Sequence, residues 1–235
     1  GAAGRGRTSG GGGGTQGARV QVGRGGKEVR EGLLRRAGLL ESQIGDAADA
    51  LRGRDRSLAE KVRREDQAMN ESFRQVREQA MVVISTQQPV ARDMRNLMEV
   101  LYIASEVERM GDYAVRIARM TSTLCGLPDQ PLRAEFGLMG DLAIEQVHDI
   151  LDALIEQDEP RAREIAARDD EIDRLYHRVF DEIIEEVAKG TDNDGALRAV
   201  TLMLVAHNLE RIGDRVTNVA EDIVFLETGQ VVELG

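Results

Sequence analysis

The sequence predicts an all-α protein made of two tandem, internally duplicated three-helix bundles. Aromatic residues make up only 3% of the chain and Trp is absent, so Leu, Ile, Val, Ala and Met must form the core, which suits packed helices better than a sheet. The four prolines leave long stretches of sequence without a helix breaker. Apolar residues also recur at helical spacing, and one acidic motif occurs in both halves of the chain.

The apolar stripes and the helix-ending residues predict six helices. We expect them at residues 28–53, 55–86, 90–122, 132–157, 160–189 and 195–228. Pro160 suits a first helical turn, and Gly190 suits a C-terminal cap. Three helices, a short linker and three more helices divide the chain into one repeat at residues 27–126 and another at 131–235.

Residues 1–26 have a different composition from the rest of the chain. They hold twelve of the 25 glycines, four arginines and no acidic residue. We predict a disordered, Gly-rich tail outside both bundles. A basic binding arm is the alternative interpretation.

The sequence Glu-Arg-x-Gly-Asp occurs twice, at residues 108–112 and 210–214. In each copy the Glu and the Gly fall within an apolar stripe of helical spacing, and the Asp lies on the same face one turn after the Glu. The two stripes are Leu97, Leu101, Ala104, Glu108, Gly111 and Val115, and Ala199, Met203, Ala206, Glu210, Gly213, Thr217, Ala220 and Val224. A buried Glu is costly unless it is paired or bound to a metal, so its repetition indicates a function.

A second acidic pair precedes each copy of the motif, Asp66 with Asn70 and Asp169 with Asp173. Asn70 precedes Glu108 by 38 residues and Asp173 precedes Glu210 by 37, enough for a helix to turn and return antiparallel. We therefore expect each bundle to hold two acidic pairs on facing helices.

These residues predict one metal site in each repeat. The first consists of Asp66, Asn70, Glu108 and Asp112, and the second of Asp169, Asp173, Glu210 and Asp214. Converging oxygen donors suit Mg, Ca, Mn or Fe, with Zn possible. The alternative is a polar network neutralised by arginines, namely Arg92, Arg95, Arg109 and Arg211. Gly111 and Gly213, between the two acids of each motif, would allow either close helix packing or room for a cation.

Charge and motifs exclude several functions. The net charge is −11, so a nucleic-acid partner is not expected. No apolar run reaches the length of about 20 residues that a membrane helix needs. The single cysteine, Cys125, fits a cytoplasmic location. We find no phosphate-binding Gly loop, zinc cluster or nucleophile motif, and therefore expect no enzymatic activity.

Several segments resemble the PhoU family of phosphate-regulation proteins. They are Gln87 to Arg95, Glu106 to Asp112, Asn208 to Asp214, Glu221 to Gly229, and the acidic pairs at 66/70 and 169/173. The resemblance covers about residues 28–235, and it implies metal clusters on the acidic motifs and frequent homodimerisation. It further implies negative control of phosphate uptake and starvation signalling, through the ATPase subunit of the Pst transporter and a PhoR-type sensor kinase.

Two other functions remain open at this point. One is a metal-storage or metal-dependent protein that uses the same carboxylates. The other is an accessory of a different phosphate carrier.

Overall fold

The computed structural model describes residues 13–235, with side chains from residue 24 onward, and is helical throughout apart from short connections. The helices are α1 (Gly13–Gly53), α2 (Arg56–Gln87), α3 (Ala91–Leu124), α4 (Ala134–Glu156), α5 (Glu159–Ala166), α6 (Asp170–Ala188) and α7 (Asn193–Thr228). No strand occurs in this range, which confirms the predicted fold class.

The predicted disordered tail at residues 1–26 is only partly within the described range. Residues 1–12 lie outside it, whereas α1 begins at Gly13, so the prediction is wrong for residues 13–26. The side-chain environment explains helix formation near the end of this stretch. Arg24 pairs with Glu28 at i,i+4, and Gly25 lies against Val83 and Gln87 of α2.

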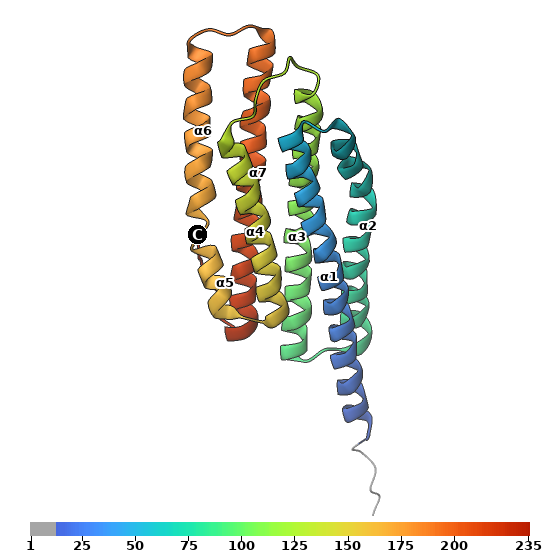
Figure 1. Cartoon of the computed structure of the whole chain (residues 1–235). Coiled ribbons are helices and arrows are strands. Elements are labelled where there is room, and N and C mark those ends of the chain that lie inside the picture. The colour runs from blue at the N-terminus through green and yellow to red at the C-terminus, as the bar shows by residue number, and fades with distance from the viewer. Residues whose placement is uncertain (1–12) are drawn as a thin grey trace, which may run out of the picture.

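The helices form two bundles that lie side by side (Figure 1). Helices α1, α2 and α3 pack together as the first bundle, and α4, α5, α6 and α7 form the second. The bundles meet chiefly where α3 packs against α7, and also where α1 packs against α4. Each acidic motif lies near the middle of one of the two central helices.

The predicted helix at 160–189 is wrong at one point, because residues 167–169 separate α5 from α6. Two side chains of α4 bind this break: Gln146 Nε2 donates to the carbonyl of Arg168 at 3.3 Å, and Asp149 pairs with the Arg168 guanidinium at 2.6 Å. These contacts stabilise a local departure from the helix. The equivalent helix of the first bundle, α2, is unbroken.

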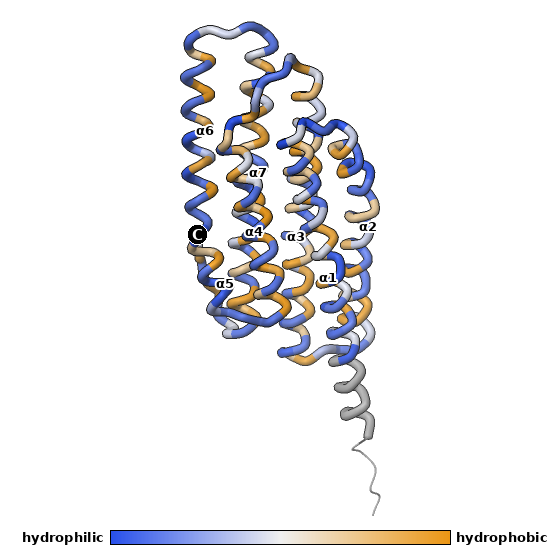
Figure 2. The backbone as a smooth tube through the Cα atoms, viewed as in Figure 1, coloured by the Kyte–Doolittle hydropathy of each residue, from blue (hydrophilic) through white to orange (hydrophobic). Residues whose placement is uncertain are grey.

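A single apolar core runs through both bundles and includes buried residues of all seven helices. Apolar and polar residues alternate along each helix, as Figure 2 shows. The side chains of Asp55, Asp158 and Asp192 cap the N-termini of α2, α5 and α7. Within the described range, no helix is both long enough and apolar enough to cross a membrane.

Candidate metal centre

The acidic residues of the second repeat come together between α6 and α7. Carboxylate oxygens of Asp169, Asp173 and Asp214 all lie within 4.8 Å of one another. The Oδ1 atoms of Asp169 and Asp173 are buried without a hydrogen-bond partner in the described structure. Glu210 lies outside this close group, with Oε2 3.4 Å from Nδ1 of His207. We call Asp169, Asp173, Asp214 and the neighbouring Glu210 the second acidic cluster.

The pKa values of these residues reflect their crowding. Burial, followed by the charges of Asp173 and Asp214, raises the pKa of Asp169 to about 6. Burial, followed by Asp214 and Asp173, raises the pKa of Glu210 to about 7. The pKa of Asp173 is raised for the same two reasons, burial and then Asp214. Each shift indicates that negative charge at this place lacks compensation from the protein.

One arginine partly compensates this charge. Arg211 Nη1 lies 3.0 Å from Asp214 Oδ2, at i,i+3 on α7. This contact supports the arginine alternative for one carboxylate. It leaves the buried oxygens of Asp169 and Asp173 without partners.

The first repeat arranges its acidic residues differently. Arg77 of α2 pairs with Glu108 at 2.5 Å, and the amide of Asn70 donates to Asp66 at 3.3 Å. Burial raises the pKa of Asp112, and the charges of Asp66 and Glu108 add to this, so the three acids are near neighbours. Within the described range, however, only the second repeat has three carboxylates whose oxygens all lie within 4.8 Å of one another.

The two motif glycines allow polar side chains to approach. A Cβ atom at Gly213 would lie 2.9 Å from Asp169 Oδ1, and one at Gly111 would lie 3.0 Å from Gln43 Oε1. Larger residues would displace these side chains. Of the two explanations the sequence left open, close approach of a facing side chain therefore applies at both positions.

Gln43 and Gln146 are site residues that the sequence analysis missed. Both are buried at equivalent positions of α1 and α4, and Gln146 Oε1 would lie 3.6 Å from a Cβ at Gly213. A glutamine on the core side of the first helix of both repeats was the available signal. Arg77 was missed as well, because its contact with Glu108 depends on how α2 packs against α3.

The donor set of the second acidic cluster fits a metal cation. Buried carboxylate oxygens without hydrogen-bond partners are costly, and a hard cation would stabilise them. In the first repeat, Arg77 donates to Glu108 and Asn70 donates to one oxygen of Asp66, whose Oδ1 is buried without a partner. The demand for a cation is therefore smaller there.

The fold and these residues define a class: a two-repeat, all-helical protein with an acidic site on the central helix of each repeat. A family model described as "PhoU domain" matches this chain twice, at residues 33–121 and 136–223. The chain belongs to the PhoU family.

Curated relatives support this assignment over nearly the whole chain. The chain is 34% identical over 209 residues to a "phosphate-specific transport system accessory protein PhoU homolog" from Clostridium acetobutylicum, covering 88% of this chain and 94% of the relative. It is also 34% identical to a Rhizobium meliloti protein of the same description, covering 82% of this chain and 81% of the relative.

Solved structures show the same fold. The phosphate transport system regulatory protein PhoU from Streptococcus pneumoniae superimposes with a TM-score of 0.83 at 25% identity, covering 92% of this chain and all of that one. PhoU from Pseudomonas aeruginosa superimposes with a TM-score of 0.82 at 31% identity, covering 87% and 97% respectively.

Proposed function

We propose that this protein is an accessory of a phosphate-specific transport system and that it restrains phosphate uptake and starvation signalling when phosphate is plentiful. The observation that carries the proposal is family membership across both repeats, with relatives described as phosphate-specific transport accessory proteins. In this proposal the protein acts by binding other proteins in the cytoplasm, without catalysis of its own.

The proposed partners are the ATPase subunit of the Pst transporter, a PhoR-type sensor kinase and a second copy of this chain. Two equivalent faces offer exposed apolar side chains for such contacts, one on α2 and α3 and the other on α6 and α7. The first face has Met81, Met98 and Tyr102, and the second has the corresponding residues Ile184, Val200 and Leu204. Because both repeats have this face, the face of one repeat can serve self-association while the face of the other repeat binds a partner.

We further propose that the second acidic cluster binds a metal ion, with Fe, Zn, Mg or Mn as candidates. Asp169, Asp173 and Asp214 would hold the ion, and Glu210 is the nearest additional acid. The bound cation would add positive charge to that of Arg211, which pairs with Asp214 alone among the acids of the cluster in the described structure. We propose weaker binding at Asp66, Asn70, Glu108 and Asp112, since Arg77 competes there.

A deletion strain tests the regulatory proposal. Without the gene, phosphate-starvation genes should stay active in phosphate-rich medium, and the wild-type gene should restore repression. Complementation with Asp169→Asn/Asp214→Asn tests whether the cluster is needed, with the exposed neighbour Asp170→Asn as the matched control. Normal repression in the deletion strain would contradict the proposal and favour metal storage through the same carboxylates. Normal starvation-gene control combined with altered phosphate uptake would favour an accessory of a different carrier.

A further inference from the structure

A buried glutamine of α4 lies at the second acidic cluster with its amide group in a fixed orientation. Gln146 is only 3% exposed and lies beside the break between α5 and α6. Its Nε2 donates to the main-chain carbonyl of Arg168 at 3.3 Å. Because a carbonyl oxygen only accepts hydrogen bonds, the amide nitrogen must face Arg168, and the amide oxygen Oε1 must point away from that carbonyl.

This amide oxygen faces the same space as a carboxylate oxygen that has no partner. A Cβ atom placed on Gly213 would lie 3.6 Å from Gln146 Oε1 and 2.9 Å from Asp169 Oδ1. Asp169 Oδ1 is buried and has no hydrogen-bond partner in the described structure. Two acceptor oxygens, one neutral and one from a carboxylate, are therefore directed to one place beside the motif glycine. A hard cation would stabilise both of them.

The break between α5 and α6 produces this arrangement. Arg168 and Asp169 are consecutive residues of the break, so one amide group binds the main chain of the first and faces the side chain of the second. In the first repeat the equivalent glutamine is Gln43, and the carbonyl that corresponds to that of Arg168 belongs to Glu65, inside the unbroken helix α2. Neither amide atom of Gln43 has a hydrogen-bond partner in the described structure. Of the two glutamines, Gln146 is thus the one whose orientation the fold determines.

We propose that Gln146 Oε1 is a neutral ligand of the ion bound by the second acidic cluster, and that it favours Mn²⁺ or Mg²⁺ over Zn²⁺. Zinc usually takes four ligands in proteins, a number that the four acids of the cluster can supply. Mn²⁺ and Mg²⁺ take six ligands, mostly oxygens, so a further oxygen contributes more to their binding. The inference rests on the metal site proposed above and adds a residue from α4, a helix that contributes none of the acids.

Gln146→Leu removes the oxygen and keeps a side chain of similar size. The affinity of the second acidic cluster for Mn²⁺ should fall about tenfold, whereas the affinity for Zn²⁺ should change by less than about twofold. Isothermal titration calorimetry on the metal-free full-length protein measures Mn²⁺ binding, and competition with a chelator measures Zn²⁺ binding. Both are done at about pH 8, because burial raises the pKa of Asp169 to about 6 and that of Glu210 to about 7.

Gln146→Glu separates a ligand from a residue that only stabilises the break. This variant keeps an oxygen beside Gly213 but loses the N–H group that binds the Arg168 carbonyl. If Gln146 is a ligand, the variant should bind Mn²⁺ at least as tightly as the wild type, because a carboxylate is a stronger ligand for a hard cation. If Gln146 serves only the break, both variants should lose the same affinity. The Glu variant also keeps the test decisive if Gln146→Leu perturbs folding.

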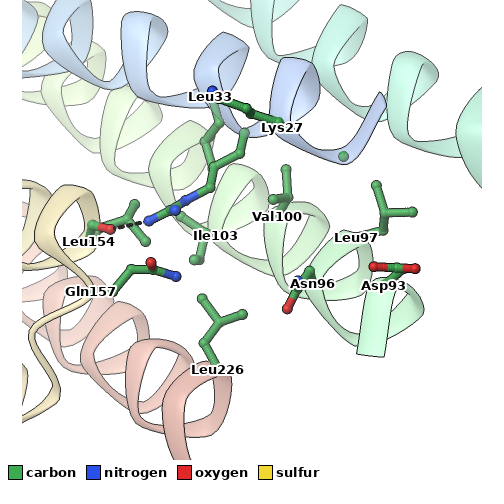
Figure 3. A pocket seen from close by; sticks show the side chains of 12 residues that line it. Lys27, Leu33, Asp93, Asn96, Leu97, Val100, Ile103, Leu154, Gln157 and Leu226 are labelled. Atoms are coloured by element: carbon green, nitrogen blue, oxygen red, sulfur yellow. Dashed lines mark hydrogen bonds between the residues drawn. The ribbon is translucent and has the colours of Figure 1, made fainter. Parts of the chain in front are cut away.

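The matched control is Gln157→Leu, which changes another glutamine of the same part of the chain. Gln157 is the C-terminal cap of α4, eleven residues or about 16 Å beyond Gln146 along the helix. It lines a pocket of about 250 Å³ between α1, α3, α4 and α7 (Figure 3), and none of the four acids of the cluster lines that pocket. The control variant should therefore bind both ions as the wild type does.

The possible failures can be told apart. Unchanged Mn²⁺ affinity in Gln146→Leu, or equal losses for Mn²⁺ and Zn²⁺ in both Gln146 variants, would overturn the role of Gln146 and leave the metal site itself standing. No binding of either ion by the wild-type protein would overturn the proposed metal site and this inference together.

Discussion

A close group of three carboxylates distinguishes the second repeat at the scale of single residues. Asp169 and Asp173 each have one buried oxygen without a partner, as Asp66 has in the first repeat, and Asp214 completes the group. In the first repeat, Asn70 replaces one of these acids and Arg77 binds Glu108. We therefore expect the two sites to differ in metal affinity although their motifs are the same.

Replacing Asp169 by Asn should remove most metal binding from the second acidic cluster. The variant loses a ligand charge while keeping nearly the same shape, so we expect at least a tenfold loss in affinity for Mn²⁺. Isothermal titration calorimetry on metal-free protein measures this change. Asp170→Asn, one residue away but exposed, is the control and should bind as the wild type does. Equal affinity of all three proteins would show that Asp169 is not a ligand.

Gly213→Ala tests the space reserved for Asp169. The added Cβ would lie 2.9 Å from Asp169 Oδ1 and should push that carboxylate aside. Metal affinity should fall about tenfold, while helix propensity raises the stability of the metal-free protein by up to about 1 kcal/mol. Gly45→Ala, where nothing lies within 4 Å of the new Cβ, should give the gain in stability alone. Unchanged metal binding in Gly213→Ala would contradict this role of the glycine.

The eight candidate ligands could be named from the sequence because the duplicated motif and helical spacing identify them. The difference between the two sites could not. It depends on the side chains of Arg77, Gln43 and Gln146, which reach the motifs from other helices. Sequence spacing describes one helix face at a time, whereas these contacts depend on how the helices pack.

At the scale of helices, the α3–α7 contact contains one acidic side chain that accepts hydrogen bonds and one that has no hydrogen-bond partner. Glu106 accepts from Arg215 at 3.3 Å and from Asn218 at 2.9 Å, and so ties the two bundles together. Glu99 is fully buried, and neither of its oxygens has a partner in the described structure. Burial, and then the charge of Asp222 on α7, raises the pKa of Glu99 to about 8, although Arg95 opposes the shift.

This raised pKa predicts a stability that depends on pH. Because folded Glu99 holds its proton above the usual value of 4.5, its contribution to stability falls as the pH rises from there to about 8. Glu99→Gln stays neutral and should be more stable than the wild type at alkaline pH, by on the order of 1–3 kcal/mol, and similar to it at acidic pH. Urea unfolding across this pH range measures the difference. A difference that does not change with pH would show that Glu99 does not titrate this way.

Helix positions followed from the sequence to within a few residues, apart from two features. Composition favoured a flexible tail through residue 26, yet α1 begins at Gly13, and Gly25 packs against α2. Periodicity favoured one helix over 160–189, yet contacts from Gln146 and Asp149 stabilise a break at residues 167–169. The break at 167–169 and the packing of Gly25 come from contacts between helices, which local propensity does not contain.

At the scale of the whole molecule, the two repeats share one core although each resembles a separate domain in sequence. The buried residues of all seven helices form one cluster, and the α3–α7 contact buries Glu106 and Glu99 between the bundles. Each repeat therefore depends on the other repeat to cover part of its buried surface. The family model matches the two repeats separately, but the packing joins them.

We expect the two repeats to unfold together. Separating α3 from α7 would expose apolar surface on both helices and leave Glu106 without Arg215 and Asn218, so a half-folded state should be strongly unfavourable. Calorimetry of the metal-free protein should show one transition, with equal calorimetric and van't Hoff enthalpies. A fragment of residues 24–126 alone should be poorly folded or self-associated, whereas the full chain cleaved between Asp129 and Gln130 should remain one folded particle. Two separate transitions, or a monomeric fragment that melts cooperatively, would mean that each bundle is stable by itself and that the α3–α7 contact is a docking interface between independent domains.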